Sequence, residues 1–400
     1  MTSSRVRQAP SIWSRQLILM AVAVFFINFG QGLFRGASTN FYIDTLRMNG
    51  TQVLWLAGFR EIPGLLLMFI AAIFMHLPLT WGAAAAILLM GIGYGLYGAI
   101  HSYLALIPIA ILASLGFHYW MPLQGAITMG LVPKEQSGLV MGTITSVRSL
   151  ASIAGMGFLA LAASFWQALS LRAYYVIGGV LIALAAILIL RLPRDVGAAP
   201  QGQRRLLLKR CYWLYYVLTF FEGSRMQVFG TFGTLVLVDN YGLAVWQISL
   251  LLLISGIVNL VLGPVLGRML DEVGERLTLS ASYVILALCF VGYAMLHNAW
   301  ILGGLLIAIN LLVTLSMGLS TYVNRIAPPE ELTPTLSAGV SINHITSVTM
   351  SLLAGSLLTI VGYEGLCWGA AIIILLSVPF ALAIKIEPAP VAQSQAVAAK

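Results

Sequence analysis

Long apolar stretches, separated by short polar or glycine- and proline-containing breaks, run along almost the whole chain. A helix that crosses a bilayer needs about 20 mostly apolar residues, because in lipid the backbone must satisfy its own hydrogen bonds. The stretches of sufficient length predict twelve transmembrane helices, over residues 17–43, 53–75, 81–100, 103–131, 138–165, 172–191, 211–238, 246–267, 277–296, 299–325, 335–361 and 366–385. The pattern therefore predicts an all-α integral membrane protein.

The amino-acid composition supports lipid as the outer solvent. Hydrophobic residues make up 60% of the 400 residues and charged residues only 8%, whereas soluble domains are roughly 45–50% apolar and about 25% charged. So few charged side chains cannot cover a water-facing surface. We expect a monomer embedded in a lipid bilayer.

The positions of the basic residues predict the orientation. Fourteen Lys and Arg residues, from Arg5 to Lys385, fall beside breaks on one side of the predicted bundle, and only Arg47 and Arg172 fall on the other. Because Lys and Arg are retained in the cytoplasm, both termini are predicted to be cytoplasmic. We expect the protein to lie in the plasma membrane, which in a cell with two membranes is the inner one. The net charge of +8 does not indicate a nucleic-acid partner, since such proteins gather basic residues on one exposed face.

The longest polar segment lies at the middle of the chain. It predicts four parts: a first six-helix bundle (1–190), a cytoplasmic linker (191–210), a second six-helix bundle (211–386) and a cytoplasmic tail (387–400). Four pairs of residues repeat between the bundles at one constant offset: Asp44 with Asp239, Gln52 with Gln247, Pro133 with Pro328, and Glu135 with Glu330. Two pseudo-symmetric six-helix bundles of this kind are a known transporter plan.

A charged segment, residues 267–276, is expected to form the loop between the eighth and ninth helices. It resembles the G-x-x-x-D-R-x-G-R-R signature of the major facilitator superfamily and keeps Gly267, Asp271, Gly274 and Arg276. In that family the loop helps to latch the cytoplasmic side, so the resemblance implies a gating role here. Asp271 could meet a helix N-terminus or an Arg of the opposing bundle, and Gly274 permits a tight turn.

Two departures weaken a drug-antiport function. The matching segment of the first half, residues 75–80, lacks every charge of the signature. The fifth helix also lacks the Gly-Pro motif of many drug exporters in the family, and residues 146–150 stand near its expected start.

Motifs of other protein classes are absent from the sequence or out of context. We find no HExxH, GxSxG or paired-carboxylate motif, so an enzyme is not expected. Three isolated cysteines (Cys211, Cys289 and Cys367) indicate neither a metal site nor a disulfide framework. Residues 93–98 fit G-x-G-x-x-G, but they lie within an apolar span, where glycine favours helix packing rather than dinucleotide binding. We expect no cofactor.

Six charged side chains fall inside predicted spans, where each costs roughly 2.5–3.5 kcal/mol on insertion scales and therefore faces a cavity or a partner. They are Arg35, Arg60, Glu61, Arg148, Glu222 and Arg225. Four positive charges against two negative ones predict an electropositive interior.

Helical spacing groups some of these residues with polar neighbours. Asn28, Gln31 and Arg35 share one face of the first helix, and Asn310 begins a polar stripe on the tenth. In the superfamily the first, fourth, seventh and tenth helices line the central path, so the resemblance implies that these two stripes face it. We expect Arg35, Gln31, Asn28, Arg148, Arg225 and Asn310 to bind substrate.

The remaining intramembrane charges have structural alternatives. Glu222 and Arg225, one turn apart, either neutralise each other or contribute separately to transport. Arg60 and Glu61 are adjacent and do not face each other, so each is expected to pair across helices. His118 and His344 are weaker candidates, since a buried neutral histidine bonded to a neighbour is common.

The favoured hypothesis is a secondary transporter that moves a small anionic or zwitterionic organic solute by alternating access. Guanidinium groups bind carboxylate and phosphate bidentately, and Glu222 or Glu61 could carry a coupling proton. The alternative is an exporter of amphipathic drug-like or lipid-like compounds, which the Met, Phe and Tyr content would suit. A receptor or scaffold that does not transport is a third hypothesis.

Overall fold

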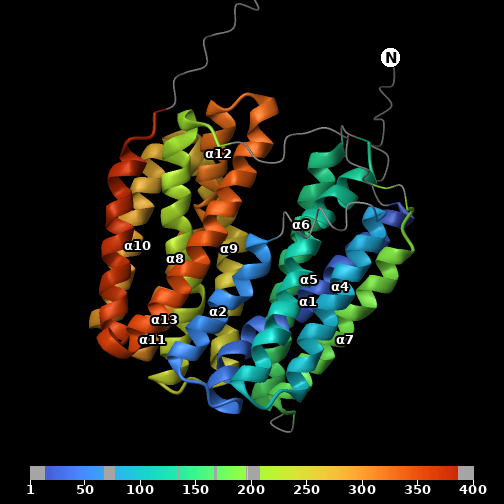
Figure 1. The fold of residues 1–400 in the computed structure, drawn as a ribbon, viewed down its shortest axis with the longest axis horizontal. Coiled ribbons are helices and arrows are strands. Elements are labelled where there is room, and N and C mark those ends of the chain that lie inside the picture. The colour runs from blue at the N-terminus through green and yellow to red at the C-terminus, as the bar shows by residue number, and fades with distance from the viewer. Residues whose placement is uncertain are drawn as a thin grey trace, which may run out of the picture.

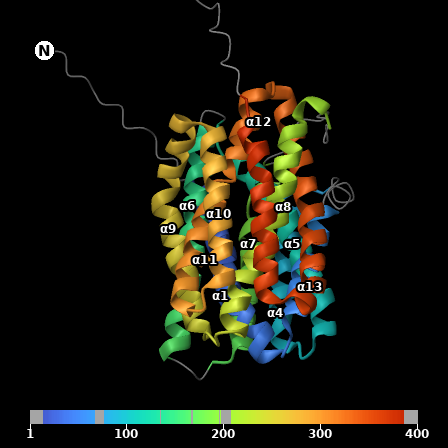
Figure 2. The ribbon, with the colours of Figure 1, turned by 90° about the vertical axis from the view of Figure 1, so that its left-hand side faces the viewer.

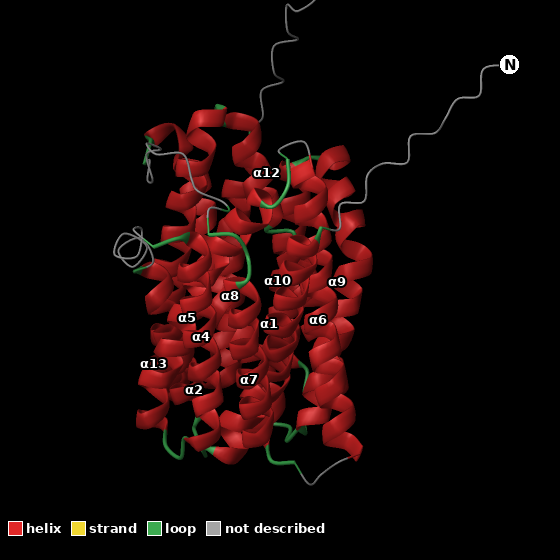
Figure 3. Cartoon of the chain, turned by 90° about the vertical axis from the view of Figure 1, so that its right-hand side faces the viewer, coloured by secondary structure: helices red, strands yellow, loops and turns green. Residues whose placement is uncertain are grey.

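The structure is a computed structural model of the chain. It describes residues 14–66, 77–133, 136–165, 169–194, 196 and 208–385, and the regular structure in these ranges is helical (Figure 1, Figure 3). Most of the predicted linker 191–210, all of the predicted tail 387–400 and the end of the second predicted span lie outside the described residues.

The described residues of the first half form six helices that each run for 16 residues or more. Ser14 and Ser102 begin two of them as N-caps, because each hydroxyl oxygen accepts a hydrogen bond from a backbone N–H three residues later. The helices are α1 (Arg15–Asn40, continued by the π-helical turn Phe41–Thr45), α2 (Gly50–Leu65), α4 (Leu79–Leu96, followed by the 3-10 turn Tyr97–Ala99), α5 (Tyr103–Gly130), α6 (Ser137–Phe165) and α7 (Leu171–Leu190).

The second half begins with the 3-10 turn Arg210–Tyr212 and continues as α8 (Trp213–Asp239), α9 (Val245–Val273), α10 (Glu275–Met295), α11 (Ala299–Thr314), α12 (Met317–Ile326) and α13 (Pro329–Leu382). The helices α11 and α12 form one span that is interrupted at Leu315 and Ser316. The 54 residues of α13 would extend about 80 Å if straight, far more than a hydrocarbon core of about 30 Å. Helical geometry is lost at Gly362, where φ is 68°, so α13 comprises two spans.

This arrangement confirms the predicted fold class. Among the described residues, nine helices are long and apolar enough to cross a membrane by length and composition. The helices α2 and α8, together with the second arm of α13, complete twelve spans in two six-helix halves. The predicted boundaries differ mainly at residues 267–276, where α9 continues to Val273 and only Gly274 (φ 86°) separates it from α10. The expected loop is a single-residue turn, because residues 268–273 continue the helical hydrogen bonding.

The outer surface of the bundle is apolar and suits lipid. Large side chains on several helices are widely exposed, including Leu104 (77%), Phe165 (79%), Trp300 (69%) and Ile360 (76%). Exposed apolar area of this extent would be unfavourable in water and is matched to hydrocarbon. The helices run side by side along the bundle (Figure 2).

The sequence repeat appears as repeated local structure. Gln52 accepts a hydrogen bond from the backbone N–H of Asn49 (3.2 Å), and Gln247 accepts one from the N–H of Ala244 (2.8 Å). Both glutamines thus cap the start of the second helix of a half. The carbonyls of Pro133 and Pro328 likewise each accept an N–H bond from the residue three positions later, at 2.9 Å. The repeated residues therefore mark equivalent helix starts.

The two halves are bonded together away from the chain ends. We call the end of the bundle near Arg15 and Lys385 the terminus side, and the end with the α1–α2 and α8–α9 turns the opposite side (Figure 1). On the opposite side Thr39 bonds Thr234 at 2.8 Å, and the Trp55 indole donates to the Leu352 carbonyl at 3.1 Å. The ribbons of the halves diverge toward the terminus side (Figure 1).

Candidate functional site

Arg35 lies on α1, which packs against helices of both halves. Its side chain is solvent-accessible and at the same time densely surrounded by protein, a combination typical of a group that faces an internal path rather than lipid. Asn28 and Gln31 on the same stripe are half-buried; Gln31 donates to the Met90 sulfur (3.2 Å) and Asn28 to its own helix backbone. Among the described residues we find no hydrogen bond or ion pair from the Arg35 guanidinium.

Arg60 lies on α2 beside an aromatic cluster of the first half. Its guanidinium donates to the Tyr94 hydroxyl at 3.4 Å. The Tyr94 ring stacks on Phe34 with centroids 4.2 Å apart, and Phe34 stacks on Tyr175 at 5.1 Å. Tyr175 is fully buried, so this cluster is packed core that holds α1, α4 and α7 together. As expected, Arg60 pairs across helices and not with the adjacent Glu61.

Glu61 points into the interface between the halves. Its Oε2 lies 2.9 Å from Nδ1 of His344, on the first arm of α13, and 3.8 Å from Nε2 of His118 on α5. The two imidazole centroids are 5.1 Å apart. Two residues of the first half and one of the second therefore form one cluster, which we call the interface triad. The cross-helix partner expected for Glu61 is thus His344, a residue that sequence reasoning ranked low.

Neighbouring residues fix the geometry of the interface triad. Nδ1 of His118 lies 2.9 Å from the Ser114 carbonyl and 3.0 Å from the Ser114 hydroxyl, which itself donates to the Arg60 carbonyl. A Cβ on Gly64 would lie 2.5 Å from Cε1 of His344 and 2.7 Å from Cδ2 of His118. Only glycine at position 64 leaves room for both rings.

Glu222 and Arg225 lie one turn apart on α8, in the second half. Arg225 is only 7% exposed, and its Cζ lies 4.2 Å from the centroid of the Tyr283 ring on α10, a cation–π arrangement. Glu222 interacts with Arg225 and with the side chain of Ser316 at the α11–α12 interruption. This charged group joins three elements of a single half.

The other two predicted substrate residues lie elsewhere in the bundle. Arg148 is exposed on α6, on the face that carries Gly155, which touches α1. Asn310 donates to the backbone carbonyl of Leu306 (2.9 Å), and its own carbonyl accepts from Asn259 of α9 (3.4 Å). Asn310 therefore takes part in α9–α11 packing.

The predicted gating segment is bonded within its own half. Arg325 of α12 reaches Glu275 with Nε (2.8 Å) and Asp271 with Nη2 (3.2 Å). Glu275 is fully buried, whereas the Asp271 side chain is 74% exposed. Arg276 is exposed and a Cβ on Gly267 would meet open space. In this conformation the arginine that meets Asp271 belongs to the same half and not to the opposing bundle.

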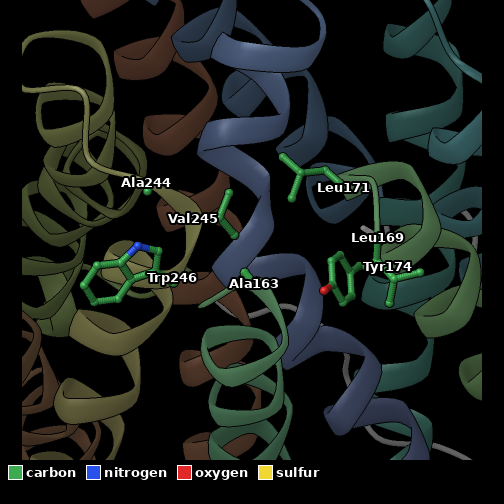
Figure 4. Close-up of a pocket in the computed structure, with 7 residues that line it drawn as sticks. All are labelled: Ala163, Leu169, Leu171, Tyr174, Ala244, Val245 and Trp246. Carbon is green, nitrogen blue, oxygen red and sulfur yellow. The ribbon is translucent and has the colours of Figure 1, made fainter. Parts of the chain in front are cut away.

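A pocket of about 330 Å³ opens on the opposite side of the bundle, between the halves (Figure 4). Its walls come from the end of α6, the start of α7 and the start of α9, with Tyr174, Val245 and Trp246 among the lining residues. None of the intramembrane charges lines it.

Comparison with known families decides the class of the chain. The family model of the Major Facilitator Superfamily matches residues 20–332 and 215–400. The chain belongs to this superfamily. It is a multi-pass membrane transporter and not an enzyme.

Solved structures with the superfamily fold agree. The nucleoside transporter NupG has a TM-score of 0.74 at 16% identity, covering 93% of this chain and 98% of that one. A bacterial homolog of the human lysosomal transporter Spinster has a TM-score of 0.71 at 11% identity, covering 91% and 95%. The D-xylose–proton symporter has a TM-score of 0.69 at 14% identity, covering 92% and 97%. No curated protein matches the sequence.

The superfamily fold explains which residues sequence reasoning missed. Glu275 lies inside the signature segment, at a position where the signature has arginine, and Arg325 was noted only for its charge. The structure pairs these two residues because α12 packs beside the junction of α9 and α10. His118 and His344 lie on α5 and α13, helices of different halves, so no spacing along the chain could have joined them to Glu61.

Proposed function

We propose that this superfamily member carries a small organic anion or zwitterion across the membrane by alternating access, with Arg35 as the contact for the anionic group. One observation carries the proposal: Arg35 is accessible inside the bundle, and we find no acidic partner for it among the described residues. An unpaired cation at this depth is costly unless a ligand or water satisfies it.

The balance of charge supports an anion over a cation. Arg225 has Glu222 nearby, and Glu61 is engaged by the interface triad, so neither acid compensates Arg35. A charge about 4 Å away at an effective dielectric near 20 is worth roughly 4 kcal/mol. A planar guanidinium also binds a carboxylate or phosphate bidentately, which a lysine cannot do.

Uptake into proteoliposomes tests the proposal. Purified protein should accumulate small labelled carboxylates or phosphate esters, and excess unlabelled anions should compete better than cations of matched size. Arg35→Lys keeps the positive charge but loses the planar guanidinium that binds two oxygens at once, and Arg35→Gln loses both. Transport should therefore fall in Arg35→Lys and fall further in Arg35→Gln. Arg47→Gln, in the turn before α2, is the matched control and should transport as the wild type does. A preference for lipophilic cations would contradict the proposal.

We also propose that transport is coupled to protons and that Glu222 carries the proton. Its carboxylate faces a single arginine of its own helix, so gain or loss of a proton would change the charge of the pair without breaking a bond between the halves. An inward proton gradient should speed uptake in the wild type and not in Glu222→Gln, while substrate exchange continues in the variant. A wild-type rate indifferent to the gradient would contradict this assignment.

The alternative, export of amphipathic compounds, draws support from the aromatic content, which is 10% of the chain. One group of aromatic side chains of the first half, however, stacks in buried core: Phe34, Tyr94, Tyr97 and Tyr175. These side chains are therefore not available to line a path for apolar compounds, and we favour transport of an anion or zwitterion.

The proposed orientation follows from the basic residues. With the termini in the cytoplasm, the opposite side, where the halves are bonded, is external, and the conformation is inward-facing. Cysteine substitutions at Arg47, Arg172 and Glu364 should react with impermeant thiol reagents added outside intact cells. Labelling only after permeabilisation would reverse the orientation.

A further inference from the structure

The interface triad has the composition and spacing of a metal site. We propose that Glu61, His118 and His344 bind a divalent transition-metal ion of the zinc type, and that the ion joins the two halves near the middle of the bundle. The three ligand atoms all lie within 4.8 Å of one another. Two imidazoles and one carboxylate are ligands that zinc accepts, with the fourth position left to water.

The distances leave room for an ion. In a tetrahedral site with bonds of about 2.1 Å, ligand atoms stand about 3.4 Å apart. Oε2 of Glu61 lies 2.9 Å from Nδ1 of His344 and 3.8 Å from Nε2 of His118. Shifts of about half an ångström in the two imidazoles would equalise these distances, well within the freedom of a side chain.

The hydrogen bonding of His118 points its free nitrogen at Glu61. Nδ1 lies 2.9 Å from the Ser114 carbonyl, which can only accept, so Nδ1 carries the hydrogen and, in the neutral ring, Nε2 presents a lone pair. That lone pair faces a carboxylate oxygen at 3.8 Å, and two acceptors at this distance are held together best by a cation between them. A backbone carbonyl that fixes the tautomer of a ligand histidine is the usual outer partner in metal sites.

The ligands of the interface triad are mostly buried. Side-chain exposure is 7% for His118, 17% for Glu61 and 15% for His344, so the ligands are sheltered and still reachable. The absence of a side chain at Gly64 keeps the two rings close. Softer metals that need thiolates have no ligand here, whereas imidazole suits zinc, copper, nickel and cobalt.

Binding would act on conformation because the ligands come from both halves. Glu61 and His118 belong to α2 and α5, and His344 belongs to α13, so all three meet only while α2 and α13 are in contact. A ligand shifts an equilibrium toward the state that it binds better, so the ion would hold the protein in the present conformation and slow transport. The binding itself does not rest on the proposed function; only its effect on anion transport does.

The test uses the purified full-length protein, stripped with a chelator, and zinc chloride alone as the probe. Zinc should raise the melting temperature of the wild type, and cobalt should give the visible absorption of a tetrahedral site. Loss of an outer partner of a metal-bound histidine already weakens binding by about 10–100-fold, so His344→Ala, His118→Ala and Glu61→Gln should each weaken it by at least about 100-fold.

A matched control separates this site from surface binding. His297 and Glu364 form an exposed pair, 3.3 Å apart, on the opposite side, and His297→Ala should leave the zinc response unchanged. If a triad variant does not fold, His344→Asn, which keeps a polar group, gives a second measurement. No shift in the wild type, or an equal shift in folded triad variants, would overturn the proposal. Neither readout needs a substrate, so failure of the anion hypothesis would leave this test intact.

Discussion

Two arginines at membrane depth, Arg35 in the first half and Arg225 in the second, have different surroundings. In the second half Arg225 is almost fully buried over the Tyr283 ring and has Glu222 one turn away. In the first half Arg35 is accessible, and we find no acid beside it among the described residues. At membrane depth, Arg225 is packed against an aromatic ring near an acid, although its buried Nη1 has no hydrogen-bond partner among the described residues, whereas Arg35 is accessible.

This difference separates structural charge from functional charge. Arg225 connects α8 with α10, and its cost of burial is offset inside a single rigid half. Arg35 has no such compensation, so its charge is available to a ligand that passes between the halves. Intramembrane charge alone identified both residues as substrate contacts; the packing supports that role for Arg35 and a structural role for Arg225.

The largest expected effect is on stability. Arg225→Gln removes a buried cation and leaves Glu222 without its partner, so the free energy of unfolding should fall by about 3 kcal/mol or more. Arg35→Gln should change it by less than about 0.5 kcal/mol, as is usual for a residue without bonded partners. Reversible unfolding in detergent measures both. Equal losses would mean that Arg35 is also a structural residue.

An intermediate effect is expected at the gating segment, where one arginine serves two acids. Glu275→Gln should cost about 1–3 kcal/mol of stability, because the carboxylate is buried against Arg325. Asp271→Asn should cost less than about 1 kcal/mol, since its side chain is widely exposed. If Asp271 acts in gating, the Asn variant should lower turnover and leave substrate affinity within a few fold. A large loss of affinity at unchanged turnover would contradict the gating role.

The smallest effect is expected at the start of α13, outside the membrane. Hydrogen bonds from Lys209 and Tyr212 lower the pKa of Glu331 below its usual value. A lowered pKa in the folded state means that the stabilisation is present above the ordinary glutamate pKa and is lost as the pH falls through the lowered one. Glu331→Gln should therefore lower the melting temperature slightly at neutral pH and leave it almost unchanged at acid pH, so that the acid limb of the profile flattens. A loss confined to acid pH would contradict this.

Much of the fold could be predicted because each transmembrane span appears in the sequence as an apolar stretch long enough to cross a bilayer. The prediction failed in detail where helical hydrogen bonding continued through polar residues, as in α9 up to Val273, and where a span was interrupted within apolar sequence at Leu315 and Ser316. Neither feature changes the hydropathy pattern, so only the backbone itself reveals them.

The site was less predictable because its contacts cross between distant helices. Arg35 could be chosen from its polar stripe, which is a local property of one helix. The partners of Glu61 and Arg325 lie 283 and 50 residues away along the chain (His344 and Glu275), and single-sequence periodicity carries no information about such pairs. Asn310 satisfied the stripe pattern equally well, yet its amide bonds its own helix.

The most direct test of the account is the affinity of Arg35→Gln for anions. Binding of small carboxylates and phosphate esters, and of cations of matched size, would be titrated on purified wild type and variant. The account predicts that the wild type binds anions in preference to cations and that Arg35→Gln loses about 1.5–3 kcal/mol of anion binding, as expected for a bond to a charged group. That loss corresponds to roughly 10- to 150-fold in affinity. A wild type that prefers cations, or a variant that binds the same anion unchanged, would contradict it.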